Sequence, residues 1–173
     1  MEILKLINSG SQKLKDNNII THKLDSEILL AKILNKKREE LLVNLDHKVS
    51  PQIIGDFEKL IARRSTKEPI AYIMEEKEFW SKNFFVNKST LIPRPETELM
   101  VEKIVNIFKK KIINILDIGT GTGCILLSIL GELKGSHGTG IDISKKAIQV
   151  AIKNSVKHKL NHQAKFYKKS FTE

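Results

Sequence analysis

Cysteine, proline, glycine and arginine are all scarce in this sequence, and each shortage excludes a class of protein. The single cysteine, Cys124, can form neither a disulfide within the chain nor a cysteine zinc site, as is usual in a reducing compartment. Nine glycines and four prolines among 173 residues, without a repeat, exclude collagen-like and low-complexity chains. With 40% hydrophobic and 29% charged residues, the sequence predicts a folded globular chain of one domain or two small ones.

No hydrophobic segment of the sequence is long enough to cross a membrane. The longest uncharged run, residues 118–131, covers 14 residues and includes four glycines, whereas a spanning helix needs about 20 apolar residues. The N-terminus lacks a continuous apolar segment with a cleavage site, and it lacks the arginine-rich character of a transit peptide. We therefore expect a cytoplasmic protein that does not enter a membrane.

The chain carries an excess of positive charge that is not gathered in one place. Lysine and arginine number 30 against 20 acidic residues, and the formal net charge of +10 attracts phosphate at long range. The lysines are scattered along the chain, so charge alone does not predict a nucleic acid as direct substrate. His158 and His162 have helical spacing, but lysines surround them, and we expect two solvated rings and no metal site.

Residues 1–75 have helical periodicity and no strand signal. Apolar residues recur at one-face spacing in four segments, at residues 3–14, 24–34, 41–45 and 53–61. The last segment has the clearest start, with Ser50 as N-cap and Pro51 at the first helical position. Because each apolar face needs a partner, we expect a small helical bundle.

A short β-favouring segment separates this bundle from the rest of the chain. Residues 79–86 are rich in aromatic and β-favouring side chains, with residues 81–83 at their centre, which predicts a hairpin. We assign residues 76–92 to a hairpin linker. The aromatic rings of Trp80, Phe84 and Phe85 could stack on a base, but aromatic side chains in hairpins are more often packing residues.

Residues 93–173 alternate between strands and helices. The near-continuous apolar run at 112–118 predicts a strand buried on both faces of a parallel sheet. There follow a glycine-rich turn, a helix over 124–133, a strand ending at Asp142, a helix from Ser144 to about Lys157 and a strand near 164–168. This order predicts an α/β fold with a Rossmann-like parallel sheet, of which the first half is present.

The glycine-rich turn is the main candidate for a binding site. Gly119, Thr120, Gly121, Thr122 and Gly123 lie where the first strand gives way to a helix, so that the backbone can turn tightly and approach a ligand. An acid, Asp142, ends the next strand, 19 residues beyond the turn, where it can accept hydrogen bonds from both ribose hydroxyls. The pattern predicts a nucleoside cofactor, and a plain packing role for the turn is the alternative.

The spacing of the glycines distinguishes between cofactor classes. The dinucleotide pattern needs Gly or Ala at the sixth position from Gly119, where this chain has Cys124, and a P-loop needs a Gly-Lys-Ser/Thr sequence that is missing here. A Gly-x-Gly-x-Gly turn after an acid, here Asp117, is instead similar to the S-adenosylmethionine site of Rossmann-like methyltransferases. That cofactor has no phosphate, so the turn would serve close packing against its methionine and ribose parts.

Two longer motifs narrow the assignment. They are Leu-Ile-Pro-Arg-Pro-Glu-Thr-Glu at residues 91–98 and Ile-Leu-Asp-Ile-Gly-Thr-Gly-Thr-Gly at residues 115–123. Together they resemble the release factor glutamine methyltransferase family, also called HemK or PrmC. The similarity extends upstream through residues 78–80, 68–72 and 25–30, so it covers nearly the whole chain.

The resemblance implies a domain organisation and a reaction. The helical domain 1–75 would recognise a protein substrate, and residues 93–173 would be an incomplete methyltransferase domain that binds S-adenosylmethionine. The methyl group would go to the side-chain amide of the glutamine in the Gly-Gly-Gln motif of peptide chain release factors, a protein methylation that serves translation termination. Residues 119–123 would line the cofactor, and Asp142 would hold its ribose.

The resemblance also places residues at the edges of the site. Phe171 fills the aromatic position beside the adenine, whereas Ser170 stands where the family tends to have an acid. Independently of the resemblance, Arg94 lies between two prolines near the expected cleft, where it could orient the substrate or, as an equal alternative, form a structural ion pair. Cys124, at the start of a helix, is expected to be a small buried apolar residue rather than a reactive thiol.

One family motif does not occur in the sequence. Asn-Pro-Pro-Tyr, which grips the substrate amide in the family, is found nowhere in these residues. An amide nitrogen is a poor nucleophile, and that motif orients it by accepting its two N–H bonds. We therefore expect no catalytic residue in this chain and no detectable methyl transfer by it alone.

Two other functions stay open. A nucleic-acid amino methyltransferase would share the chemistry and would suit the positive charge, and its affinity for substrate would fall steeply with salt. A non-catalytic remnant of a split gene would dock release factors or nothing. A folded chain that does not bind S-adenosylmethionine would favour the second of these.

Overall fold

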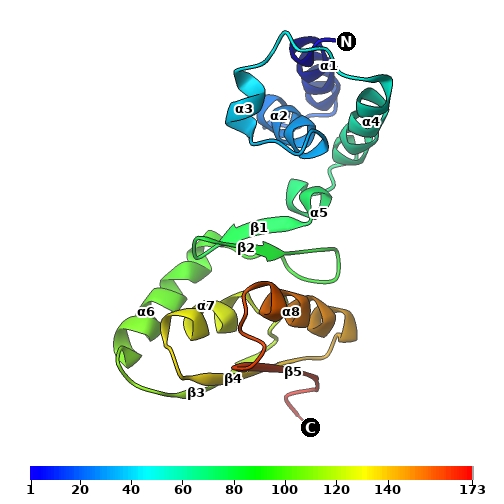
Figure 1. Ribbon diagram of the computed structural model, residues 1–173. Coiled ribbons are helices and arrows are strands. Elements are labelled where there is room, and N and C mark those ends of the chain that lie inside the picture. The colour runs from blue at the N-terminus through cyan, green and yellow to red at the C-terminus, as the bar shows by residue number, and fades with distance from the viewer. Residues whose placement is uncertain (173) are drawn as a thin grey trace. The chain divides into compact units, whose positions relative to one another are not determined.

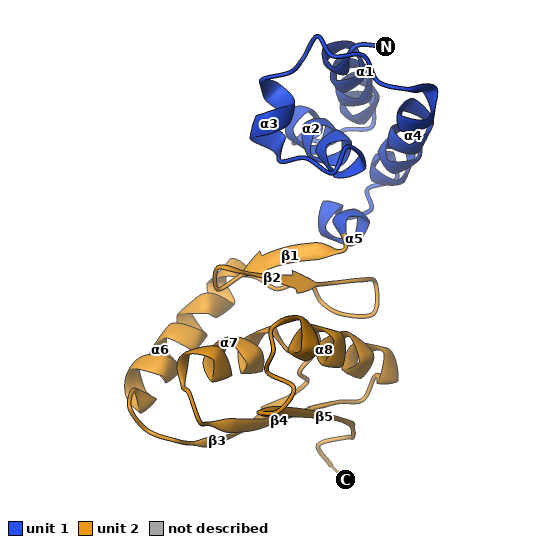
Figure 2. Ribbon diagram, viewed as in Figure 1, with its two compact units in different colours: residues 1–74 blue, residues 75–173 orange. Residues whose placement is uncertain are grey.

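The computed structural model describes residues 1–172. It divides the chain into two compact units, one ending at Met74 and the other beginning at Glu75 (Figure 2). None of the helices in this described part has the length and apolar content that a membrane crossing requires.

The first unit consists of helices, as the periodicity predicts. They are α1 (Ile3–Asp16), α2 (His22–Ile33), α3 (Arg38–Leu42), α4 (Pro51–Ser65) and α5 (Ile70–Met74) (Figure 1). Ser50 caps α4, because its hydroxyl accepts a hydrogen bond from the backbone N–H of Ile53 at 3.4 Å. Helices α1, α2 and α4 pack on one another around Phe57, and a Cβ on Gly10 would lie 2.6 Å from the ring of Phe57. The glycine therefore permits the close approach of these helices.

Two buried acids in α2 are paired with arginines. The carboxylate of Asp25 accepts a hydrogen bond from Nε of Arg64 at 2.7 Å, and Arg38 Nε donates to the carboxylate of Glu27 at 2.6 Å. Both carboxylates are almost fully buried. Removing one partner would leave an uncompensated charge in the core, so these pairs hold the helices in one arrangement.

The second unit contains a two-stranded hairpin and a three-stranded sheet with helices. Its elements are β1 (Glu76–Phe79), β2 (Lys82–Phe85), the 3₁₀ helix η1 (Pro95–Thr97), α6 (Glu98–Phe108), β3 (Asn114–Ile118), α7 (Cys124–Glu132), β4 (His137–Asp142), α8 (Lys145–Lys157) and β5 (Ala164–Lys168). The α/β class and the strand–helix order are as predicted. Ser144 is the N-cap of α8, since its hydroxyl accepts from the N–H of Ala147 at 3.2 Å.

The sheet is parallel and has the order β3-β4-β5. The strands run in the same direction, and the helices that connect them, α7 and α8, lie on the same face of the sheet, as Figure 1 shows. The prediction that residues 112–118 are buried on both faces is wrong. On the face opposite the helices, Leu116 is 58% exposed and Ile118 is 50% exposed, and Tyr167 is exposed on the same face two strands away, with Ile141 of β4 between it and Ile118. We call this surface the open face.

The hairpin differs from the prediction in the position of its turn. The turn residues are Trp80 and Ser81, both with positive φ (52° and 53°), one to two residues before the predicted centre. Packing against the core of the second unit accounts for the shift. Phe79 and Phe84 must both point into this core, where their rings meet edge to face at 6.2 Å. The prediction that Phe84 is a packing residue is confirmed.

Candidate cofactor site

The turn between β3 and α7 has a backbone that only glycine adopts readily. Gly119, Gly121 and Gly123 have φ values of +74°, +55° and +76°. A Cβ on Gly119 would meet no atom within 4 Å, so the turn is open to the outside at this point. A Cβ on Gly123 would lie 3.3 Å from Ala151 and Phe166, so this glycine also serves the packing of the turn on α8 and β5.

Four of the five backbone N–H groups of the turn, residues 119–123, are bonded within the protein. Those of Gly119 and Thr120 donate to the carbonyl of Ile141 at 2.9 and 3.0 Å, and that of Gly123 donates to the carbonyl of Thr120 at 2.8 Å. The N–H of Gly121 donates to the carboxylate of Asp142 at 3.0 Å. A phosphate-binding turn presents such N–H groups to its ligand, whereas four of the five in this turn are already occupied, which disfavours a phosphate here.

Asp142 lies against the turn at the carboxyl end of β4. One carboxylate oxygen accepts from Gly121 at 3.0 Å, and the other accepts from the N–H of Ser144 at 2.9 Å. Each oxygen keeps a further lone pair, and the residue is only partly buried. The carboxylate is therefore fixed in place and can still accept hydrogen bonds from two hydroxyl groups.

A second acid lies at the start of the turn. Asp117 accepts a hydrogen bond from the hydroxyl of Thr120 at 2.6 Å. Burial raises the pKa of Asp117, the hydrogen bond from Thr120 lowers it, and the nearby charge of Asp142 raises it further. Two carboxyl groups thus share this end of the sheet, and the site favours donors of hydrogen bonds.

A hollow of about 140 Å³ adjoins the turn and brings Arg94 to it. Gly119, Thr120, Gly121 and Thr122 line one side, and Arg94 belongs to the 91–97 segment on the other side. The volume is below the roughly 300 Å³ of typical small-molecule sites, so a ligand here would extend over the open surface at Gly119.

Cys124 is one of the residues that line this hollow, and it is buried, as predicted. Its burial raises the pKa of the thiol to about 11, and the nearby charge of Asp117 also raises it. The thiolate form is therefore suppressed at neutral pH, and the side chain behaves as a small apolar group.

Phe171 lies in a different hollow from the glycine turn. This hollow, of about 650 Å³, is on the open face and is also lined by Ile141, Tyr167 and Ser170. Phe171 is 72% exposed, as is suitable for a ring that stacks on a ligand rather than in a core. Of the predicted site residues, Arg94 and residues 119–122 thus line one hollow and Phe171 lines another, while Gly123 and Asp142 line neither.

Sequence reasoning missed an exposed apolar residue beside Asp142. Ile143 is 73% exposed although it directly follows the fixed carboxylate. Its position immediately after the acid was the available signal. Sequence reasoning also missed Gly140 of β4, where a Cβ would lie 2.8 Å from Oγ1 of Thr120. The missing side chain lets the turn fold down onto the strand.

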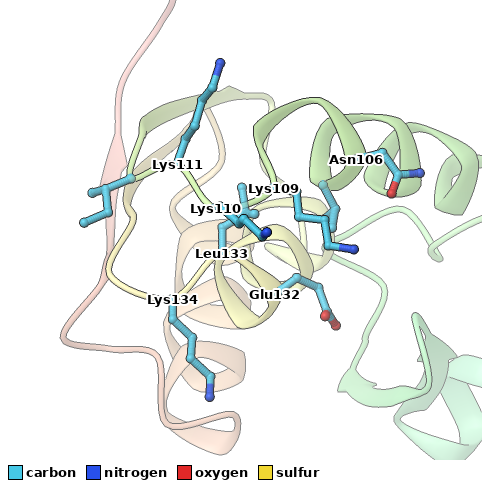
Figure 3. A pocket seen from close by; sticks show the side chains of 9 residues that line it. Asn106, Lys109, Lys110, Lys111, Glu132, Leu133 and Lys134 are labelled. Atoms are coloured by element: carbon cyan, nitrogen blue, oxygen red, sulfur yellow. The ribbon is translucent and has the colours of Figure 1, made fainter.

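A third hollow, of about 470 Å³, lies at the opposite ends of the strands. Figure 3 shows Lys109, Lys110, Lys111 and Lys134 around it, with the side chains of Lys111 and Lys134 pointing away from each other. The ammonium groups of Lys111 and Lys134 therefore do not converge on one anion. Ligands of open α/β sheets bind at the carboxyl ends of the strands, so this hollow is not the candidate cofactor site.

The two histidines with helical spacing do not share one environment. His162 is exposed, but His158 is half-buried and its ring lies 4.5 Å from that of Phe84, so the prediction of two solvated rings is wrong for His158. The hairpin covers this end of α8 and removes water from the ring. Residues 1–172 contain no group of three or more His, Cys, Asp or Glu side chains that could hold a metal ion.

Each unit of the chain is similar to a known domain family. Residues 5–74 match the family model of the PrmC N-terminal domain, and residues 109–173 match that of a methyltransferase domain. The chain is 42% identical over 156 residues to a release factor glutamine methyltransferase from Leptospira interrogans, covering 89% of this chain and 54% of that protein.

Two further relatives show the same pattern. A release factor glutamine methyltransferase from Vibrio cholerae is 37% identical over 167 residues, covering 95% of this chain and 57% of that protein. A bifunctional methyltransferase from Rickettsia typhi is 39% identical over 175 residues, covering 90% of this chain and 34% of that protein. The chain spans about half the length of the release factor glutamine methyltransferases that it matches.

Proposed function

Because the first unit matches the PrmC N-terminal domain and the second matches a methyltransferase domain, we propose that the chain belongs to the PrmC family and that its glycine turn binds S-adenosylmethionine for the methylation of a glutamine side-chain amide in peptide chain release factors. The proposal is supported by 42% and 37% identity to release factor glutamine methyltransferases over about nine tenths of the chain. A partner of the translation apparatus would also place the protein in the cytoplasm.

The observation that carries the cofactor assignment is the hydrogen bond between Asp142 and the turn. Asp142 occupies the N–H of Gly121 with a carboxylate, whereas a nucleotide site would offer that group to a phosphate. An anionic phosphate would also be repelled by the carboxylates of Asp117 and Asp142. A nucleoside that carries a sulfonium and an ammonium group instead of phosphates fits this charge.

The apolar residues next to the acid fit the adenine part of the cofactor. Ile143 and Phe171 are both mostly exposed, and they follow the ends of neighbouring strands β4 and β5. We propose that these two side chains offer apolar surface to the adenine while Asp142 accepts hydrogen bonds from the ribose hydroxyls. Ser170, beside Phe171, is left as the polar neighbour of the adenine amino group.

Each residue has a defined part in this proposal. The turn from Gly119 to Gly123 packs its bare backbone against the cofactor, and Asp142 fixes the ribose end. When bound, S-adenosylmethionine supplies the methyl group. Arg94 lines the same hollow as Gly119, and we propose that it orients the substrate. The helical unit, residues 1–74, is proposed to recognise the release factor.

Calorimetric titration tests the cofactor assignment. The chain is titrated with S-adenosylmethionine and with S-adenosylhomocysteine, and NAD serves as a matched nucleotide control. We expect saturable binding of both sulfur nucleosides and none of NAD. Binding of NAD alone, or of nothing by a well-folded chain, would contradict the assignment and favour a dinucleotide site or a binding protein without cofactor.

A second titration tests the partner. The chain is titrated with a peptide chain release factor and with a duplex RNA at 50 and 200 mM salt. A protein surface predicts a small loss of affinity for the release factor, whereas a nucleic-acid substrate that contacts six phosphates predicts a loss of about 10³-fold. Steep, tight RNA binding without binding of the release factor would favour the nucleic-acid amino methyltransferase.

A further inference from the structure

The side chain of Asn154 connects two segments of the second unit that are distant in sequence. Asn154 lies in α8 and is fully buried. Its Oδ1 accepts a hydrogen bond from the N–H of Phe85 at 2.7 Å, and its Nδ2 donates to the carbonyl of Phe85 at 3.0 Å. The same Nδ2 donates to the carbonyl of Thr122 in the glycine turn at 2.9 Å. All three bonds thus go to backbone groups.

Only an asparagine can make this set of bonds at this position. The site requires one acceptor and two donations from a short side chain, which matches the primary amide. A carboxylate would place an oxygen against two carbonyl oxygens, and an apolar side chain would remove the partners of three backbone groups that are buried or part-buried. The amide therefore fixes the end of β2 and the Thr122 peptide in one arrangement.

Neighbouring residues of α8 strengthen the connection to the hairpin. Nζ of Lys153 lies 3.2 Å from the centroid of the Phe85 ring, and Nζ of Lys157 pairs with the carboxylate of Glu76 at 2.7 Å. Glu76 and Phe85 are paired across the hairpin. One stretch of the helix therefore holds both strands of the hairpin, and Asn154 alone among these three residues also holds the turn.

We infer that Asn154 is a positioning residue that links order in the hairpin to cofactor binding at the glycine turn. The Thr122 carbonyl that it holds belongs to the peptide that precedes Gly123, so loss of this bond frees the turn at Thr122, next to the Gly121 N–H that Asp142 holds. Linkage of this kind is reciprocal: a ligand that orders the turn also orders the hairpin end at Phe85. The cofactor part of this inference rests on the proposed function, whereas the coupling of the two segments does not.

The test is amide hydrogen exchange in Asn154→Asp, with Ser155→Ala as matched control. Ser155 is equally buried, but its hydroxyl donates only to Ile152 within α8. In Asn154→Asp we expect the amides of Gly121 and Gly123 to exchange at least about tenfold faster relative to that of Gly138 in β4, and the affinity for S-adenosylhomocysteine to fall by a similar factor. In the control Ser155→Ala, we expect neither the relative exchange rates of Gly121 and Gly123 nor the affinity for S-adenosylhomocysteine to change.

Two results would overturn the inference. One is wild-type protection of the Gly121 and Gly123 amides, relative to Gly138, in Asn154→Asp. The other is a measurement on the wild-type chain, which tests the inference even if the variant does not fold. In low concentrations of urea, the amides of Phe85 and Gly121 should exchange through one opening with the same urea dependence, and separate openings would show that the segments are not coupled.

Exchange measured with and without S-adenosylhomocysteine distinguishes a failure of this inference from a failure of the proposed function. If the wild-type chain binds S-adenosylhomocysteine, the ligand should also slow exchange of the Phe85 amide, and unchanged exchange would refute the linkage. If the wild-type chain does not bind it, the proposed function fails. The exchange comparison between the two variants still decides whether Asn154 positions the turn.

Discussion

The imidazole ring of His158 packs against the ring of Phe84 with their centroids 4.5 Å apart. Burial lowers the pKa of His158 below its ordinary value of 6.5, and the charges of Lys157 and Lys82 lower it further, whereas a hydrogen bond with the backbone of Asn83 opposes them. The folded protein therefore prefers the neutral ring. The hairpin and α8 meet at a contact that protonation weakens.

This contact predicts a loss of stability on acidification. Since the pKa of His158 is lower in the folded state than in the unfolded state, its contribution is present above pH 6.5 and is lost as the pH falls through the folded value. We expect Tm to decrease between pH 7 and pH 5 in the wild type and to decrease less in His158→Phe. His162→Gln, at an exposed position, should behave as the wild type. Equal pH dependence in all three proteins would refute the role of His158.

Replacing the acid at the turn tests the cofactor site. In Asp142→Asn the side chain keeps its shape but loses its charge and one acceptor for a ribose hydroxyl. Hydrogen bonds to charged groups contribute about 1.5–3 kcal/mol, so we expect affinity for S-adenosylhomocysteine to fall about 10- to 100-fold. Titration calorimetry measures the effect, and Asp46→Asn, an exposed acid in the first unit, is the control. Undiminished affinity in Asp142→Asn would remove this residue from the site.

Alanine substitutions distinguish the two roles of the glycines. Gly119→Ala has room for its methyl group but is strained by its φ of +74°, so we expect a cost of about 1–2 kcal/mol. Gly123→Ala adds contacts at 3.3 Å with Ala151 and Phe166 and should cost more. Gly55→Ala, in the interior of α4 with nothing within 4 Å, should instead stabilise the protein by about 0.5–1 kcal/mol.

Urea denaturation of these three variants measures the order of the effects. We expect the free energy of unfolding to rank Gly55→Ala above the wild type, then Gly119→Ala, then Gly123→Ala. In addition, Gly119→Ala should weaken the binding of S-adenosylhomocysteine, because its methyl group projects toward the open side of the turn. A Gly119→Ala variant with normal binding would indicate that the ligand does not approach the turn there.

The thiol of Cys124 is predicted to be unreactive in the folded chain. With a pKa of about 11 instead of the ordinary 9.0, its thiolate fraction at neutral pH is about 100-fold lower, and the thiolate is the reactive form. We expect alkylation by iodoacetamide to be at least that much slower in the native chain than in urea. Cys124→Ala provides the blank, because the sequence has no other cysteine. Native reaction at the rate of a free thiol would contradict the burial of this side chain.

The elements of the fold follow from local signals in the sequence. Ser50 and Ser144 start their helices where the capping pattern predicts, because a cap is decided within four residues. Local signals do not predict the position of the hairpin turn, because Trp80 and Ser81 adopt positive φ values that neither residue favours on its own. Their conformation is imposed by the packing of the rings on either side.

The sequence predicted those residues of the candidate site that follow a recognisable spacing along the chain. The glycine turn and Asp142 are recognised by spacing, and the structure brings them within hydrogen-bond distance. Asn154 gave no signal, because a polar residue within a helix usually faces water, and its partners Phe85 and Thr122 are far away in the chain. The burial of β3 was also unpredictable, because a continuous run of apolar residues does not show whether one face or both faces of a strand are covered.

The open face of the sheet has a consequence for the chain in concentrated solution. Leu116, Ile118 and Tyr167 present an apolar surface that attracts any similar surface at contact distance. The net charge of +10 acts over a longer range and keeps molecules apart. Salt shortens the range of this repulsion from about 10 Å at 0.1 M to about 3 Å at 1 M. The chains should therefore repel one another at low ionic strength and associate through the open face as the ionic strength rises.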